Sequence, residues 1–136
     1  KRMDTILSGT YGDVELHGVL SPNDTLGRAA LTAVAQAGKD TPVVTGQDSE
    51  VESMKSIMMG EQYSTIYKDT RELVAQTIKQ IQALQKGEEP EINDTESYDN
   101  GVKVVPSYLL TPVIVTKENA ADVYQDDETL FPLTQG

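Results

Sequence analysis

The sequence has no cysteine and no tryptophan, and histidine and phenylalanine each occur once in its 136 residues. The lack of cysteine excludes disulfides, zinc–thiolate sites and a cysteine nucleophile. The one histidine, His17, precedes a predicted strand, away from the strand end where ligands bind, and is expected to be a surface residue without a serine or threonine partner. Glycine-rich phosphate loops are also missing. These absences predict that the chain is not an enzyme and needs neither a cofactor nor a metal.

Long apolar runs and positive charge are equally scarce. No apolar run approaches the roughly 20 residues that span a bilayer. Eleven Lys and Arg residues against 22 Asp and Glu give a formal net charge of −11, which makes nucleic acid and anionic membranes poor partners. The chain begins KRMDTILSG, without an initiator methionine or a signal peptide, and we expect it to be a piece of a longer protein.

What the sequence does contain is one design repeated three times: a short apolar strand, a polar turn and an amphipathic helix. The repeats cover residues 18–38, 42–60 and 63–87, and each helix ends at a glycine. In the second repeat, Ser49 and Glu52 have the spacing of a capping box. Successive strand–helix units predict an α/β fold with a doubly wound, mostly parallel sheet in a three-layer αβα arrangement.

The chain changes character after Gly87. Residues 88–99 form an acidic stretch, EEPEINDTESYD, which lacks the spacing of an EF-hand and is expected to be a solvated loop. Residues 102–105 and 109–115 are strand-like but are interrupted by Pro106 and Pro112, so edge or crossover strands are predicted. Residues 117–123 favour a short helix, and the remainder is expected to be an acidic tail with little structure.

Polar side chains follow each of the three predicted strands: Asn23 and Asp24, then Asp48, then Lys68 and Asp69. Parallel strands bring these side chains to one edge of a sheet, where open α/β sheets bind ligands. Carboxylate, amide and ammonium groups together suit an uncharged polyol such as a sugar. Asn, Asp and Ser are also common helix N-caps, which gives Asp24, Ser49 and Asp69 a capping role as the alternative. For each residue taken alone, a capping or turn role is the better expectation.

Three stretches carry a resemblance to a known family: GVLSPNDTLGRAALTAVAQAG, PVVTGQDSEVESMKSIMMGEQYSTIYKDTREL and NGVKVVPSYLLTPVIVTKEN. They resemble the C-terminal part of bacterial type I periplasmic sugar-binding proteins, in the branch that binds multiple sugars, xylose and galactose for ABC transporters. The resemblance implies that Asn23, Asp48 and Lys68 contact a monosaccharide. It gives Asp24 and Asp69 supporting or capping roles.

Proteins of this family have two α/β lobes that close on the sugar, and the resemblance implies a division of this chain between them. Residues 1–68 would belong to the C-terminal lobe and residues 69–101 to the N-terminal lobe. Residues 102–136 would cross between lobes and return to the C-terminal lobe. Most of the N-terminal lobe is missing from the sequence, so the helix over residues 70–87 would expose its apolar face. This face would pack on the rest of the chain or on another copy of it.

The resemblance also implies the setting of the protein. A monosaccharide and the membrane permease of a sugar ABC transporter would be its partners, and some relatives serve chemotaxis. Its location would be periplasmic or extracellular, with a lipid anchor in some full-length forms. The effector-binding domain of a sugar-responsive transcriptional repressor has the same fold and stays open as an alternative function.

Overall fold

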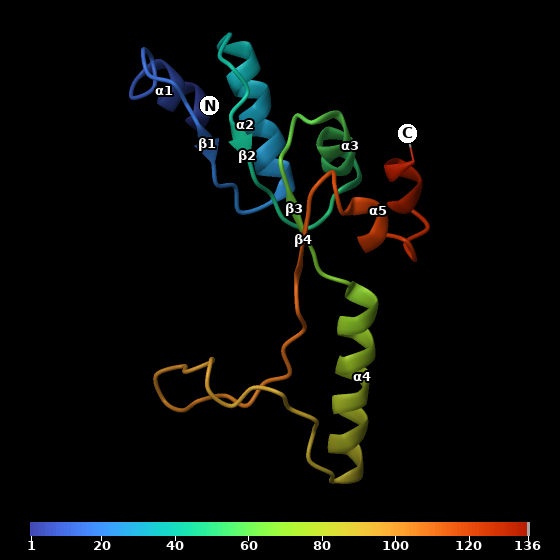
Figure 1. The fold of residues 1–136 in the computed structure, drawn as a ribbon. Helices are drawn as coiled ribbons and strands as arrows, with labels where there is room; N and C mark the ends of the chain where they lie inside the picture. Colours follow the sequence, from blue (N-terminus) through green and yellow to red (C-terminus); the bar gives the residue numbers. More distant parts are fainter. Residues whose placement is uncertain (136) are drawn as a thin grey trace. The chain divides into compact units, whose positions relative to one another are not determined.

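A computed structural model describes residues 1–135, which form two compact units (Figure 1). The first unit contains residues 1–67 and the chain from Val113 onward, and the second contains Lys68–Pro112. The first unit consists of α1 (Arg2–Ser8), β1 (Gly18–Val19), α2 (Asp24–Gln36), β2 (Val43–Val44), α3 (Val51–Met59), β3 (Thr65–Tyr67), β4 (Val113–Val115), α5 (Ala120–Val123) and the 3-10 helix η1 (Phe131–Thr134). The second unit has one helix, α4 (Thr70–Lys86).

The three predicted strand–helix repeats are present as β1–α2, β2–α3 and β3–α4. Strands β1 and β2 pair in parallel, with Gly18 opposite Val43. The backbone N–H of Tyr63, just before β3, donates to the carbonyl oxygen of Val44 in β2 at 2.9 Å. This confirms the predicted α/β class with a parallel sheet, present here in partial form.

Strand β3 pairs with β4 in the antiparallel sense, in a second two-stranded sheet, and Thr65 lies opposite Val115. The predicted strand at 109–115 is therefore shorter than expected and begins directly after Pro112, which has no N–H to donate. The prediction of a strand at 102–105 was wrong, because only isolated bridges occur in this part of the chain. Backbone N–H groups of this loop donate to side chains instead of to a neighbouring strand. Asn100 Oδ1 accepts from the N–H groups of Val102 and Lys103, both at 3.0 Å.

The main hydrophobic core of the first unit contains residues from α3, β4, α5 and the segment after α5. Its buried members are Met54, Ile57, Val115, Ala120, Tyr124 and Leu130. A smaller core joins α1 to α2 through Leu7, Ala33 and Val34. The expectation of an unstructured tail after residue 123 was wrong, because Tyr124 and Leu130 are buried and anchor this segment to α3.

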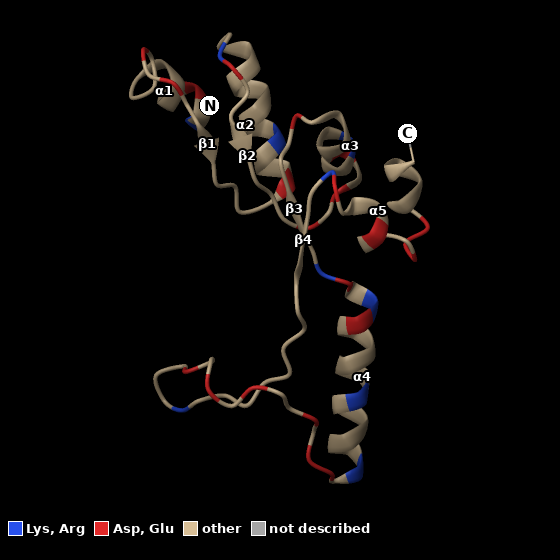
Figure 2. Ribbon diagram, in the orientation of Figure 1, with Lys and Arg blue, Asp and Glu red and all other residues tan. Residues whose placement is uncertain are grey.

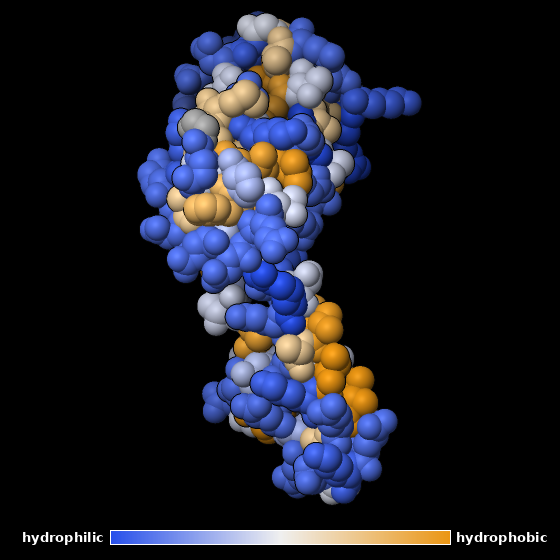
Figure 3. All heavy atoms as spheres, turned by 90° about the vertical axis from the view of Figure 1, so that its right-hand side faces the viewer, coloured by the Kyte–Doolittle hydropathy of each residue, from blue (hydrophilic) through white to orange (hydrophobic). Residues whose placement is uncertain are grey.

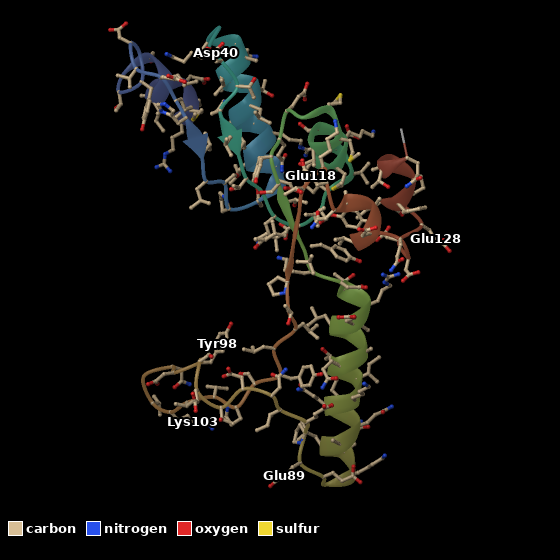
Figure 4. All side chains as sticks on the ribbon, in the orientation of Figure 1. Asp40, Glu89, Tyr98, Lys103, Glu118 and Glu128 are labelled. Atoms are coloured by element: carbon tan, nitrogen blue, oxygen red, sulfur yellow. The ribbon has the colours of Figure 1, made fainter. Side chains whose placement is uncertain are left out.

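In the second unit, α4 begins where Asp69 accepts a hydrogen bond from the Arg71 backbone N–H at 2.9 Å, and it ends at Gly87. Gly87 has a φ of +75°, which glycine adopts without strain. A loop carrying Tyr98 and Lys103 follows the helix (Figure 4). Among the described residues, none of the helices has the length and apolar character needed to cross a membrane.

The apolar face of α4 is exposed. Its side chains gather as an orange stripe in the lower part of Figure 3, and they are Leu73, Val74, Ile78, Ile81 and Leu84. Each of these side chains is about half exposed or more, as the resemblance implied for this helix. Packing of this face on another copy of the chain stays a prediction. Gln76 is the one buried residue of α4, and its Nε2 lies 3.5 Å from Oε2 of Glu91 in the following loop.

The apolar face of α4 leads us to expect self-association of the chain at micromolar concentration, because large exposed apolar patches favour association that removes them from water. Ile78→Glu should weaken this association by placing a charge in the stripe, whereas Lys79→Glu, on the opposite side of the helix, should leave it largely unchanged. Light scattering measures the mass. A monomeric mass for the unchanged chain would contradict the expectation.

Replacing Tyr124 by phenylalanine tests the packing of the C-terminal segment. Tyr124 Oη donates to Ser49 Oγ at 2.7 Å and both residues are buried, so Tyr124→Phe should lower the free energy of unfolding by about 1–2 kcal/mol at neutral pH. Urea unfolding measures the change.

The same variant should also change the pH dependence of stability. Burial raises the pKa of Tyr124 to about 12, whereas a tyrosine in the unfolded chain has a pKa of about 10. The stabilisation from this neutral tyrosine is complete below the unfolded pKa and is lost as the pH rises towards the folded one. The wild type should therefore lose more stability than Tyr124→Phe across that range. Parallel pH curves for the two proteins would contradict the assignment.

Candidate functional site

The turns after β1 and β2 lie next to each other in the first unit. Because these strands pair in parallel, their carboxyl ends share one edge of the sheet. The backbone N–H of Asp24, which follows Asn23, donates to the carbonyl oxygen of Gln47 at 2.9 Å. Gln47 directly precedes Asp48, so this bond brings together the chain segments that carry Asn23 and Asp48.

Asn23 is the N-cap of α2. Its backbone is extended, and its side-chain Oδ1 accepts a hydrogen bond from the Leu26 N–H at 2.9 Å. The sequence predicted a cap at Asp24, and the structure places the cap one residue earlier, at Asn23. The cap also fixes the orientation of the amide at the end of β1, which leaves capping and ligand binding compatible.

Asp48 is exposed and lies in a bend with an unusual backbone. It has a φ of +95°, and the following residue, Ser49, has a φ of +53°. The capping box predicted for Ser49 and Glu52 was wrong: α3 begins one residue later, with Glu50 as N-cap, and no side chain of the cap residue bonds to the helix. The left-handed backbone turns Ser49 inward, where its Oγ accepts from Tyr124.

Asp24, and not Ser49, accepts a hydrogen bond at the start of α3. Its carboxylate is fully buried, and Oδ2 accepts from the Glu50 N–H and from Thr65 Oγ1, both at 2.9 Å. Oδ1 accepts from Gln62 Nε2 at 2.9 Å. A negative charge at a helix N-terminus also interacts favourably with the helix dipole. Asp24 thus joins the turn after β1 to α3 and to β3.

Gly46 leaves the room for this carboxylate. A methyl group at Gly46 would overlap the Asp24 carboxylate and lie 2.6 Å from Gln62 Nε2. Gln62, Thr65 and Tyr124 were not predicted from the sequence as supports of the site. The available signal was weak: Gln62 is a polar residue directly before the predicted strand, and Thr65 is a β-branched residue within it, which is common in strands.

Glu50, at the start of α3, is held from α2. Arg28 Nη2 lies 2.7 Å from Glu50 Oε2 in a partly buried ion pair, and Thr25 Oγ1 donates to Glu50 Oε1 at 2.7 Å. These contacts fix the N-terminus of α3 against α2. The bend at Asp48 is thereby bounded by a rigid helix start.

A hollow of about 480 Å³ opens at the same edge of the sheet, within the first unit. It is lined by Leu20, Ser21, Pro22, Thr45, Gly46, Gln47, Ser64, Ile66 and Ile114. Its walls are mostly apolar, with a few hydroxyl and amide groups, as is usual for small-molecule sites. Acidic residues occur along both units (Figure 2). Among the described residues, no group of three or more acidic or histidine side chains could hold a metal ion.

Lys68 begins the second unit and is exposed. It directly follows β3 and precedes Asp69, the N-cap of α4. The structure therefore brings the segments of Asn23 and Asp48 together, while the contribution of Lys68 stays a prediction.

Comparison with known proteins shows which family the chain belongs to. Residues 1–89 match the periplasmic binding protein domain, and the chain belongs to this family. The match covers the three strand–helix repeats that carry Asn23, Asp48 and Lys68.

Individual relatives are more specific. Over 123 residues the chain is 54% identical to the multiple sugar-binding periplasmic receptor ChvE of Rhizobium radiobacter, covering 87% of this chain and 35% of the receptor. It is 35% identical over 120 residues to the D-xylose-binding periplasmic protein of Escherichia coli, covering 87% of this chain and 36% of that protein. The chain thus spans about a third of the length of the curated relatives it matches.

Solved structures of solute-binding proteins also resemble this chain. An ABC transporter solute-binding protein from Clostridium phytofermentans with bound β-D-glucose matches with a TM-score of 0.88 and 36% identity, over 98% of this chain and 42% of that one. A carbohydrate transporter solute-binding protein from Chloroflexus aurantiacus in complex with D-glucose matches with a TM-score of 0.82 and 35% identity, over 93% of this chain and 37% of that one.

The role of Asp24 is tested by Asp24→Ala. The change leaves the Thr65 hydroxyl and the Glu50 N–H without their acceptor and removes one acceptor from Gln62. Since each buried polar group left unpaired costs about 1–3 kcal/mol, the variant should lose roughly 3 kcal/mol or more of stability.

The matched control is Asp40→Ala, at the exposed connection between α2 and β2 (Figure 4). It should change stability by no more than about 0.5 kcal/mol. Thermal and urea unfolding measure both variants. Equal effects at the two positions would contradict the role given to Asp24.

Proposed function

We propose that the chain supplies one wall of a monosaccharide-binding cleft in a periplasmic solute-binding protein. The observation that carries the proposal is the Asp24 N–H···Gln47 hydrogen bond, which brings the segments of Asn23 and Asp48 together at the carboxyl edge of a parallel sheet. The family membership and the 54% identity to a multiple sugar-binding receptor support it.

The side chains suit a sugar. The Asp48 carboxylate accepts hydrogen bonds from two hydroxyls, and the Asn23 amide offers donors as well as an acceptor. Lys68 would add a cationic donor. Bonds to charged groups are stronger than bonds between neutral ones, so a few such contacts hold an uncharged aldopentose or aldohexose. The apolar side chains of Leu20, Pro22 and Ile66 line the neighbouring hollow and suit the C–H faces of the ring.

The binding is proposed to serve uptake rather than chemistry. Delivery to the membrane permease of an ABC transporter, from a periplasmic or extracellular and in some forms lipid-anchored protein, follows from the transport receptors among the relatives. No catalysis and no nucleic-acid binding are proposed. The alternative of a repressor effector domain has no observation in its favour among the relatives reported above.

The wall is one side of a cleft. In the family, the second lobe supplies the opposing contacts, and this chain covers about a third of its curated relatives. We therefore expect weak sugar binding or none from the chain by itself. A two-lobed receptor that contains this chain should bind aldopentoses or aldohexoses, visible as a rise in melting temperature in a thermal-shift screen.

Asp48→Ala in such a receptor tests the site. Loss of the carboxylate removes a charged partner from the sugar hydroxyls, and affinity for the best sugar of the screen should fall by about tenfold or more. Isothermal titration calorimetry measures the affinity. Asp40→Ala, at the opposite end of β2, serves as the control and should bind as the wild type does. Unchanged affinity in Asp48→Ala would remove Asp48 from the site.

A further inference from the structure

Two successive left-handed residues form the bend that carries Asp48. Asp48 has a φ of +95° and Ser49 a φ of +53°, and neither is a glycine. Non-glycine residues rarely adopt this conformation, and where they do the surrounding structure holds them in it. The contacts of the bend therefore decide where the Asp48 carboxylate lies.

Hydrogen bonds from outside the bend hold it in place, and three of them involve Ile66, Thr65 and Tyr124. The Asp48 N–H donates to the carbonyl oxygen of Ile66 at 3.0 Å. The Ser49 N–H donates to Thr65 Oγ1 at 3.1 Å, and Tyr124 Oη donates to Ser49 Oγ at 2.7 Å. Two of the three are made by side chains rather than by the sheet, so they depend on residue identity.

Thr65 can accept from Ser49 because its own proton is used elsewhere. A threonine hydroxyl has one proton and two lone pairs. Thr65 Oγ1 donates to Asp24 Oδ2 at 2.9 Å, and the same oxygen accepts from the Ser49 N–H. Thr65 is completely buried, so no water replaces either bond. The fixed carboxylate of Asp24 thus orients the Thr65 hydroxyl towards the bend.

Tyr124 holds the bend from the C-terminal segment. Its ring is fully buried and lies edge-on to Tyr67, with ring centroids 5.1 Å apart. Its hydroxyl reaches Ser49 across 75 positions of sequence. The aromatic contact fixes the ring, and the ring places the hydroxyl at the bend.

We infer that Thr65 and Tyr124 are positioning residues for sugar binding: they hold the left-handed bend at Asp48 and Ser49, and so aim the Asp48 carboxylate at the ligand. The inference rests on the proposed function, because it assumes that Asp48 contacts the sugar. Neither residue touches the ligand. Both act through the backbone of the bend.

The test compares two substitutions at Thr65 in a two-lobed receptor containing this chain. Thr65→Val keeps the shape of the side chain but removes the hydroxyl, and Thr65→Ser keeps the hydroxyl. With D-glucose and D-xylose as probes in calorimetry, Thr65→Val should lower affinity by about fivefold or more, and Thr65→Ser should stay within about twofold of wild type, because misplacing one bonding group weakens binding steeply.

A double-mutant cycle with Asp48→Ala separates positioning from a general loss of structure. If Thr65 acts through Asp48, Thr65→Val should change affinity by less than about twofold in the Asp48→Ala background. An equal loss in both backgrounds would overturn the inference. If Thr65→Val does not fold, the same cycle with Tyr124→Phe decides in the same way.

The outcomes also separate this inference from the proposed function. Unchanged affinity in Thr65→Val or Tyr124→Phe, with a loss in Asp48→Ala, overturns the positioning roles and leaves the sugar site standing. Unchanged affinity in Asp48→Ala overturns the site itself.

Discussion

The buried carboxylate of Asp24 is the interaction on which the rest of the first unit depends. A charge without contact to water requires hydrogen bonds, and Asp24 receives them from Gln62, Thr65 and the backbone of Glu50. These donors come from the start of α3 and from the segment around β3, while Asp24 itself begins α2. The requirement to satisfy one carboxylate therefore fixes three parts of the chain relative to each other.

The candidate binding edge follows from this constraint. Asp24 follows Asn23 directly, and its N–H meets the carbonyl of Gln47, next to Asp48. The backbone of one residue thus joins the two turns while its side chain anchors the helix after the second turn. Rigid supports of this kind keep ligand-binding groups in place before the ligand arrives, which lowers the cost of ordering them on binding.

Local signals predicted the repeats and the cap of α4 at Asp69, but they did not predict contacts between residues far apart in the sequence. The glycine after each helix and the polar turn before it marked the strand–helix repeats, whereas the cap of α2 lies at Asn23 and not at Asp24. Ser49 matched a local capping box, but a carboxylate from a residue 26 positions away bonds to Glu50 at the start of α3 instead. Tyr124 lies in a stretch rich in acidic residues, so its place in the core could not be read from periodicity. The apolar stripe of α4 was correctly seen as a helix face, yet the sequence does not say what covers it.

We propose that the strand-end groups of this chain contact a monosaccharide. The most direct measurement is a crystal structure of a two-lobed receptor containing the chain, with D-glucose or D-xylose bound. We expect the Asp48 carboxylate and the Asn23 amide within hydrogen-bonding distance of sugar hydroxyls, with the positive φ of Asp48 and Ser49 retained. A sugar bound elsewhere, or one with no contact to either side chain, would contradict the account.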